Sequence, residues 1–291
     1  MKTTIASLLA LLIPSGVIAL PLGNPCDPGL LRTGVFCKGI CSKDDDKDPP
    51  QFCEVWSWRI GYYGDFVQNR HMEIDRSEDN SSLRQTRLET HAASLALNFW
   101  DRFDVFGTAG TTHVTVSTPG RAFRPTAILD NQNVTIDTDT HFSWSFGLRG
   151  MLWECGPLGF GAEVQYAHAR PHLNSFTVEG LDPFYYTTST HLDYHEWQMG
   201  IGVAYRIPIA GCSTALVPYV GLKWAHAKMQ ANTPQTPVTP LTTYTLFDLE
   251  SERDFGFAIG ITLIGCSKIS LSIEGRFLDE RAFSLNSQIR F

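Results

Sequence analysis

The C-terminal end of the chain carries the pattern that most restricts its fold. From Arg281 to Phe291 the residues alternate between apolar and polar, and the chain ends on a phenylalanine. Successive side chains of an extended strand point to opposite faces. One face carries Phe283, Leu285, Ile289 and Phe291, and the other carries Ala282, Ser284, Asn286, Gln288 and Arg290. Such a strand suits the wall of a bacterial outer-membrane barrel, where one face contacts lipid and the other faces a polar interior.

The N-terminal end predicts export. Met1–Ala19 has one early lysine, an apolar core over Ile5–Ile13, and a small-residue ending at Val17 and Ala19. These are the parts of a cleaved secretion signal, and the apolar run is too short for a helix that spans a bilayer. We therefore divide the chain into a signal peptide at residues 1–19, a cysteine-rich periplasmic segment at residues 20–55, and a barrel at residues 56–291.

Composition argues against helical membrane spans and against a nucleic-acid partner. After the signal, no stretch of about 18 residues is apolar throughout. The mean hydropathy of −0.10 does not oppose a barrel, because half of the residues in each strand face a polar interior. The formal net charge is −7, whereas nucleic-acid binding usually requires a basic surface, so the charge argues against a nucleic-acid partner.

The segments after residue 55 predict an all-β fold, a transmembrane antiparallel barrel of about ten strands. The predicted strands are Trp56–Val67, Leu88–Phe99, Phe103–Ser117, His141–Leu152, Leu158–Arg170, Glu196–Arg206, Thr214–Met229, Asp254–Ile264, Ile269–Phe277 and Ala282–Phe291. Long connections at 68–87, 118–140, 171–195 and 230–253 alternate with short ones. The exception is the connection at 278–281, which is short although it lies on the same side as the long connections. Short periplasmic turns and long outer loops are typical of outer-membrane barrels.

Aromatic residues near the predicted strand ends favour a membrane over a water-soluble sandwich. Alternation of apolar and polar residues, with Phe142, Trp144, Phe146 and Leu148 on one face, would suit a membrane barrel or a water-soluble sandwich equally well. Amphipathic rings settle at membrane interfaces, however. The rings near strand ends include Trp56, Trp100, Trp153, Trp224 and Phe291.

The chain has seven cysteines, all after the predicted signal: Cys26, Cys37, Cys41, Cys53, Cys155, Cys212 and Cys266. The first four lie in the N-terminal segment and the other three in short turns, so the barrel topology places all seven on the periplasmic side. An oxidising compartment favours disulfides, and an odd number leaves at least one thiol unpaired or bonded to another molecule. No set of Cys and His residues completes a zinc site, so we expect no metal.

Several segments resemble the chlamydial major outer membrane porin family, in order along the whole chain. They are Leu20–Pro28 (LPLGNPCDP), Trp56–Val67 (WSWRIGYYGDFV), Leu152–Gly156 (LWECG), Gln165–Pro171 (QYAHARP), Glu196–Ile207 (EWQMGIGVAYRI), Pro218–Ala227 (PYVGLKWAHA) and Glu274–Phe291 (EGRFLDERAFSLNSQIRF). The aromatic ending at Phe291 also resembles the signal that bacterial barrel-assembly machinery recognises.

The family resemblance implies an outer-membrane β-barrel that passes small solutes and ions, and we expect no cofactor. It also implies a homo-oligomer in contact with outer-membrane lipid and with disulfide-linked envelope proteins. This chain is shorter than a typical family porin and its outer loops are compact, so the strand number and the pore width do not carry over directly.

If the predicted registers hold, nine charged residues point into the lumen. They are Arg59, Asp65, Arg149, Glu163, Arg206, Lys223, Glu274, Arg276 and Arg290. The excess of cations would give the pore a mild anion preference. Alternatively, the charges pair across the lumen as structural fill.

The predicted strand number conflicts with a wide pore. Eight-stranded barrels are filled by side chains, and wide aqueous channels need about 16–18 strands. Ten strands give a narrow path, unless Ala122–Asp137 and Thr242–Leu249 add pairs and bring the number to twelve or more.

Three other interpretations stay open beside the porin. A structural or adhesive envelope barrel would have a blocked lumen. An outer-membrane hydrolase would use the loop residues Asp137, Asp139, His191, Asp193 and His195, although no serine nucleophile motif accompanies them. A calcium site at Lys43–Asp48 would lack the spaced ligands and the glycine of a calcium loop, so we favour a solvated linker there. We expect no catalytic residue.

Overall fold

The computed structural model describes residues 22–31, 55–75, 83–120, 123–124, 132–180, 182–185, 190–210, 213–231, 236–239, 242–246 and 248–291. The predicted signal peptide and most of the predicted periplasmic segment lie outside these ranges. Within them, none of the helical structure has the length and apolar character needed to cross a bilayer.

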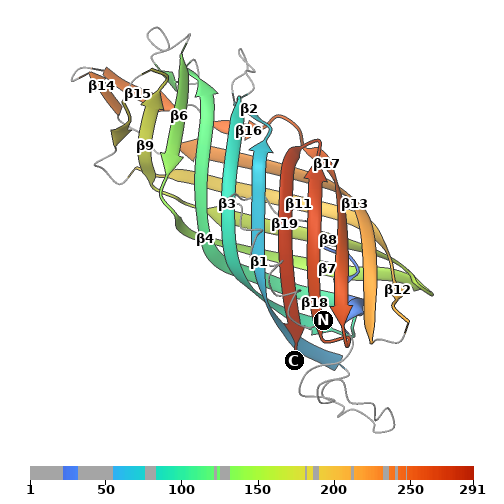
Figure 1. The fold of residues 1–291 in the computed structure, drawn as a ribbon. Coiled ribbons are helices and arrows are strands. Elements are labelled where there is room, and N and C mark those ends of the chain that lie inside the picture. The colour runs from blue at the N-terminus through green and yellow to red at the C-terminus, as the bar shows by residue number, and fades with distance from the viewer. Residues whose placement is uncertain are drawn as a thin grey trace, which may run out of the picture.

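Ten long antiparallel strands close into a barrel (Figure 1). In ring order they are β1 (Trp56–Arg70), β3 (Gln85–Phe99), β4 (Phe103–Pro119), β7 (His141–Cys155), β8 (Leu158–Ala169), β11 (Leu192–Tyr205), β13 (Thr214–Ala231), β17 (Phe255–Gly265), β18 (Ile269–Phe277) and β19 (Glu280–Arg290). The predicted fold class and the number of about ten barrel strands are therefore confirmed.

The ring closes where the first strand meets the last. Arg59 lies opposite Arg290 and Tyr63 opposite Asn286 in an antiparallel register that continues to Arg70. The backbone N–H of Phe291 donates to the carbonyl of Trp58 at 2.8 Å. The C-terminal alternation that predicted a barrel wall thus supplies the seam that completes it.

Apolar residues face outward and polar residues inward, as a barrel in lipid requires. On β7, Phe142 and Phe146 are 58% and 52% exposed, whereas the neighbouring Ser143 and Ser145 are buried. Aromatic side chains at the ends are also exposed, including Trp100 at 64% and Trp153 at 50%. These tryptophans are not core residues, which agrees with a position at an interface.

One end of the barrel has short turns, and we call it the short-turn end. Trp100 and Asp101 connect β3 to β4 with φ of 52° and 54°, and Cys266 and Ser267 connect β17 to β18 with φ of 51° and 55°. Two consecutive left-handed residues are typical of the tight hairpins whose twist matches that of the strands. Phe291 lies at the same end, and the opposite end is the long-loop end (Figure 1).

The ring narrows toward the long-loop end. The hairpin between β18 and β19 turns at Leu278 and Asp279, and Asp279 is fully buried. Beyond this turn, β2 (Met72–Ile74) pairs directly with β16 (Leu249–Ser251), which also pairs with β13. The wall therefore continues past the hairpin without β18 and β19.

The remaining strands extend the wall or lie beside it. β6 (Asn133–Thr138) pairs with β4 and β9 (Leu173–Val178), and β9 pairs with β10 (Phe184–Tyr185). β12 (Ile207–Pro208) pairs with β13, while β5 (Phe123–Arg124), β14 (Thr236–Thr239) and β15 (Thr242–Leu246) form a small separate sheet. The segments that we considered as extra barrel pairs do form strands, but these strands lie outside the ten-strand ring.

A packed apolar core fills the interior at the long-loop end. Its buried members come from strands on every side of the narrowed ring, so the core crosses the lumen. They are Val67, Met72, Ile74, Leu83, Leu88, Val114, Val116, Val134, Ile136, Ala169, Leu173, Phe176, Val178, Leu192, Tyr194, Ala227, Met229 and Leu249. A ring of about eight strands is narrow enough for side chains alone to fill it.

Candidate functional site

The structure places the nine predicted lumen charges on the inner face, eight of them buried. Those eight are Arg59, Asp65, Arg149, Glu163, Lys223, Glu274, Arg276 and Arg290. Arg206 is half-buried at the short-turn end, where its backbone N–H donates to the carbonyl of Pro157. That these residues line a conducting pore remains a prediction.

Sequence reasoning missed almost as many buried charges as it found. The additional residues are Asp27, Arg70, Asp104, Glu196, Lys268, Asp279 and Glu280. With them, the buried charges of the described residues are seven cations and eight carboxylates, so the cation excess behind the expected anion preference disappears. Glu196 shares the face of Arg206 on the predicted strand Glu196–Arg206, so the face rule would have identified it.

The charges near the short-turn end form one cluster around two arginines. Arg59 Nη1 lies 3.0 Å from Asp104 Oδ2, and Arg149 Nη2 lies 3.5 Å from the same oxygen. Arg149 also approaches Asp27 at 3.2 Å and Glu163 at 3.7 Å. The carboxylates thus compensate two guanidinium groups that are out of contact with bulk water.

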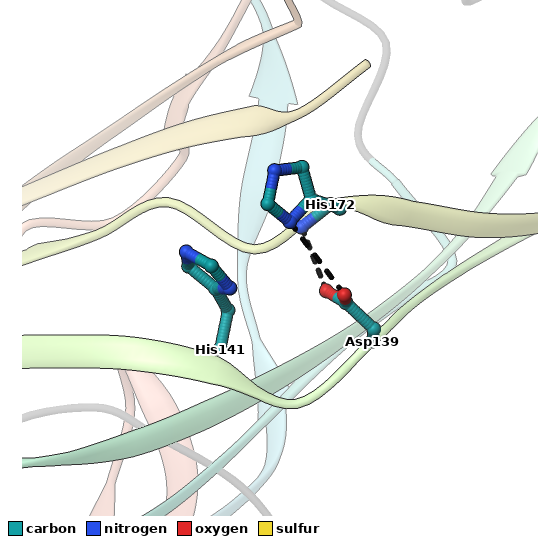
Figure 2. Close-up of side chains that lie close together, drawn as sticks. All are labelled: Asp139, His141 and His172. Atoms are coloured by element: carbon teal, nitrogen blue, oxygen red, sulfur yellow. Dashed lines mark hydrogen bonds and ion pairs between the residues drawn. The ribbon is translucent and has the colours of Figure 1, made fainter. Parts of the chain in front are cut away.

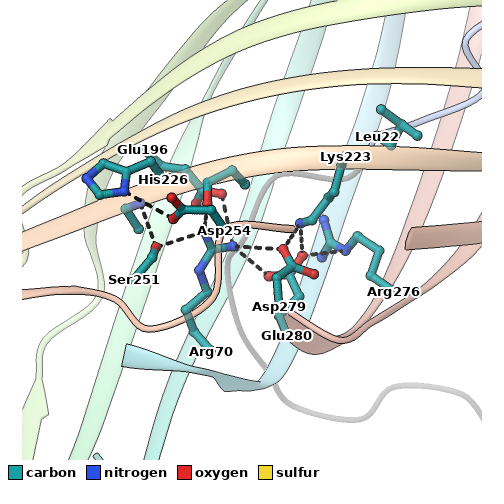
Figure 3. Close-up of polar contacts among 12 residues, drawn as sticks. Leu22, Arg70, Glu196, Lys223, His226, Ser251, Asp254, Arg276, Asp279 and Glu280 are labelled. Atoms are coloured by element: carbon teal, nitrogen blue, oxygen red, sulfur yellow. Dashed lines mark hydrogen bonds and ion pairs between the residues drawn. The ribbon is translucent and has the colours of Figure 1, made fainter. Parts of the chain in front are cut away.

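A second cluster lies under the buried hairpin turn (Figure 3). Arg70 Nη1 lies 3.0 Å from carboxylate oxygens of both Glu196 and Glu280. Lys223 Nζ contacts Asp279 at 2.9 Å and also pairs with Glu280. These contacts bring β1, β11, β13 and β19 together across the lumen. The cluster therefore obstructs the lumen, as expected if the charges pair across it and serve as structural fill.

The N-terminal residues Leu22–Leu31 lie inside the barrel, which we did not predict for the segment that we expected in the periplasm. The backbone N–H of Leu22 donates to Glu274 Oε1 at 3.0 Å, and Asn24 Nδ2 donates to Thr262 Oγ1 at 3.1 Å. Farther along, the helix α1 (Asp27–Leu30) offers the carbonyl of Pro28 to Arg59 Nη2 at 2.7 Å. Lumen groups thus satisfy the polar atoms of this segment.

Lumenal glycines make room for this segment. A Cβ atom on Gly161 would lie 2.1 Å from the carbonyl oxygen of Pro25. Cβ atoms on Gly200 and Gly221 would lie 1.8 Å and 2.1 Å from the side chain of Leu22. The small inward residues of β8, β11 and β13 therefore hold a peptide and not an open channel.

The described part of the barrel has small cavities beside the segment. One cavity, lined by Ser94, Thr108 and Gln165, offers about 30 Å³ to the centres of water molecules. A single water needs about 10–15 Å³ on this measure, so the cavity holds a few waters. A sugar or an amino acid does not pass through such a space.

The described cysteines differ in their surroundings. Cys26 is a free thiol buried in the barrel, and burial, aided by the Asp27 carboxylate, raises the pKa of this thiol well above its ordinary value. Cys155 is a free thiol exposed at the short-turn end, and Cys266 is disulfide-bonded. Cys37, Cys41, Cys53 and Cys212 lie outside the described residues, so the disulfides expected for them stay a prediction.

The loop residues considered for a hydrolase are distributed over separate contacts. Asp137 Oδ1 lies 3.0 Å from His113 Nε2, and Asp193 Oδ1 lies between His168 Nε2 at 2.8 Å and His195 Nε2 at 3.1 Å. Asp139 contacts His172, which forms a strand bridge with His191. The candidate residues therefore do not meet in one acid–histidine arrangement.

The buried cluster at Asp104 predicts a large cost for removing one charge. We expect Asp104→Asn to lower the free energy of unfolding by about 3–5 kcal/mol, because Arg59 and Arg149 would lose the carboxylate that they share. Urea unfolding in lipid vesicles measures this change.

Glu250→Gln is the matched control, since the Glu250 carboxylate is partly exposed and its ion pair with the exposed Lys228 is long, at 3.9 Å. Its effect should stay within about 1 kcal/mol. Equal effects of the two substitutions would contradict a compensated buried cluster.

Comparison with known proteins gives consistent matches over the chain. The profile of the family described as Chlamydia major outer membrane protein matches residues 1–87, 79–181 and 177–250. The major outer membrane porin of Chlamydia pneumoniae is 30% identical, with 94% of each chain covered. The serovar D porin of Chlamydia trachomatis is 29% identical, with 100% of each chain covered.

Solved structures with a related outline are more distant. The outer membrane protease OmpT from Escherichia coli has a TM-score of 0.42 at 8% identity, covering 81% of this chain and 96% of that one. The translocator domain of the autotransporter NalP from Neisseria meningitidis has a TM-score of 0.39 at 11% identity, covering 85% and 90%. These scores are too low for either structure to bear on function.

Proposed function

Because the chain belongs to the Chlamydia major outer membrane protein family, we propose that it is an outer-membrane porin that passes small solutes and ions by passive diffusion. The observation that carries this proposal is the closed ring of ten strands with apolar side chains outside and charged side chains inside. Family membership favours transport over catalysis.

The conformation described here corresponds to a closed state of this porin. Leu22–Leu31 occupies the short-turn half of the lumen through hydrogen bonds and packing. Non-covalent contacts of this kind can be replaced by water, which would leave a polar lining around Arg149, Glu163 and Gln165. We therefore assign Leu22–Leu31 as the part that must leave before solutes enter.

A second candidate is an envelope barrel that does not conduct. The apolar core at the long-loop end favours it, because this core crosses the lumen independently of Leu22–Leu31. Conduction requires this core to open as well, whereas a structural barrel keeps it packed.

Oligomerisation and disulfide linkage are further parts of the proposal. The exposed free thiol of Cys155 supports a link at the periplasmic side, since it lies at the short-turn end, where barrels of this topology face the periplasm. Lipid contacts belong to the exposed apolar band, and oligomer contacts would use part of the same band.

Displacing the N-terminal segment should remove one of the two obstructions in the lumen and so favour the open porin. We expect Gly161→Val to raise the single-channel conductance or the open probability in planar bilayers, because its side chain would occupy the position of Pro25. Ala162→Val is the control, since the next residue on β8 faces outward. No conductance from the native protein, from Gly161→Val or from a variant that lacks residues 22–31 would favour the non-conducting barrel.

Cross-linking through Cys155 is tested on gels of native envelopes. We expect high-mass species under non-reducing conditions that become monomers on reduction and that decrease in Cys155→Ser. A monomer band under both conditions, or no change in Cys155→Ser, would contradict a link at this position.

A further inference from the structure

Three side chains with metal-ligand atoms converge at the long-loop end of the barrel. Asp139, His141 and His172 each place one such atom within 4.8 Å of the other two. Figure 2 shows the two imidazole rings and the carboxylate around a common gap. Asp139 is exposed and the two histidines are half-buried, so an ion can reach the gap from solution.

Coordinated irregularities in two neighbouring strands create this convergence. Along the chain, β6 ends at Thr138 and β7 begins at His141, and β8 ends at Ala169 and β9 begins at Leu173. The β6–β9 register shifts at the same level. Bulges of this kind redirect side chains and are common at barrel rims.

Two hydrogen bonds fix the interrupted segments to each other. The backbone N–H of Asp139 donates to the carbonyl of His172 at 2.8 Å. In return, the backbone N–H of His172 donates to Asp139 Oδ1 at 2.8 Å. One carboxylate oxygen is therefore held by the backbone, and Oδ2 remains directed toward the imidazole.

The side-chain spacing fits two ligands of one ion better than a hydrogen-bonded pair. His172 Nδ1 lies 3.6 Å from Asp139 Oδ2, which is longer than a hydrogen bond. Zinc bonds of about 2.0–2.1 Å in a tetrahedral site put neighbouring ligands about 3.3 Å apart. The His141 ring meets the His172 ring edge-on, with centroids 4.5 Å apart, so small rotations bring both into range.

A nearby group with the same residue types shows the contrast. His168 and His195 lie 2.8 Å and 3.1 Å from Asp193 Oδ1, and the Tyr166 hydroxyl lies 2.6 Å from His195 Nδ1. The metal-ligand atoms of this group also lie within 4.8 Å of one another. However, both imidazoles already lie at hydrogen-bond distance from Asp193 Oδ1, and the Tyr166 hydroxyl is hydrogen-bonded to His195 Nδ1. This group provides an internal control with two histidines and one aspartate.

We propose that Asp139, His141 and His172 form a binding site for one divalent transition-metal ion of the zinc class. Two imidazoles and one carboxylate are ligands that Zn²⁺ accepts, and the tetrahedral position left over would hold water or an additional ligand. His191 bridges to His172, with ring centroids 6.3 Å apart, and is placed to approach that position. Binding would connect the β6–β7 and β8–β9 junctions and stabilise the long-loop end.

The test is a Zn²⁺ titration of the mature chain, refolded in detergent with its free thiols alkylated, by isothermal calorimetry. We expect saturable binding of one ion per chain. His141→Ala and His172→Ala should each weaken it by about tenfold or more, whereas His168→Ala in the hydrogen-bonded group should not. Asp139→Asn retains an oxygen for the His172 N–H but loses the charge, so it should weaken binding without loss of fold.

X-ray absorption at the zinc edge of the unmodified chain gives a second readout that needs no variant. We expect the scattering pattern of imidazole and oxygen ligands. The proposal is overturned by the absence of saturable binding, by binding that the His141→Ala and His172→Ala double variant leaves unchanged, or by sulfur ligands or a lack of imidazole ligands at the zinc edge.

Discussion

The structure depends on one constraint: a strand surrounded by lipid cannot leave its backbone N–H and C=O groups without partners. Lipid offers no hydrogen bonds, so the sheet must close on itself, and β1 and β19 complete that closure from the two ends of the barrel sequence. Closure then gives every strand an outer and an inner face. The outer face becomes apolar, and the charged side chains are left to a narrow interior where each needs a partner.

The width of the ring determines what fills that interior. Where ten strands form the wall, the side chains of the strands do not fill the interior. The segment Leu22–Leu31 occupies the remaining space and packs against Gly161, Gly200 and Gly221. Past the β18–β19 turn, β2 and β16 pair directly and the narrower lumen holds an apolar core. Between them lies the cluster around Arg70, Lys223 and Glu280, in which buried charges compensate each other. Along the barrel axis, the interior thus holds first the Leu22–Leu31 segment, then a layer of ion pairs, and then an apolar core.

The barrel could be predicted from the sequence because period-two alternation is local. Phe283 and Ile289 on one face, with Ser284 and Arg290 on the other, already specify the wall and its direction. The lumen could not be predicted in the same way. That Asp27 meets Arg149 depends on residues 122 positions apart, and no periodicity records it. Gly161 on β8 and Gly200 on β11 leave space in the lumen, but only the fold shows that Pro25 and Leu22 occupy it.

The most direct test of the filled lumen uses two cysteines of the chain itself. Cys26 is 2% exposed among lumen residues, whereas Cys155 is exposed at the short-turn end, and both are free thiols. Folded monomer in vesicles is treated with a membrane-impermeant maleimide, labelling is followed by peptide mass spectrometry, and urea-unfolded protein gives the intrinsic rates. The account predicts that Cys155 reacts readily in the folded protein, while Cys26, which is covered in the closed conformation, reacts much more slowly than it does after unfolding. Labelling of Cys26 in the folded barrel at the rate of Cys155 would contradict it.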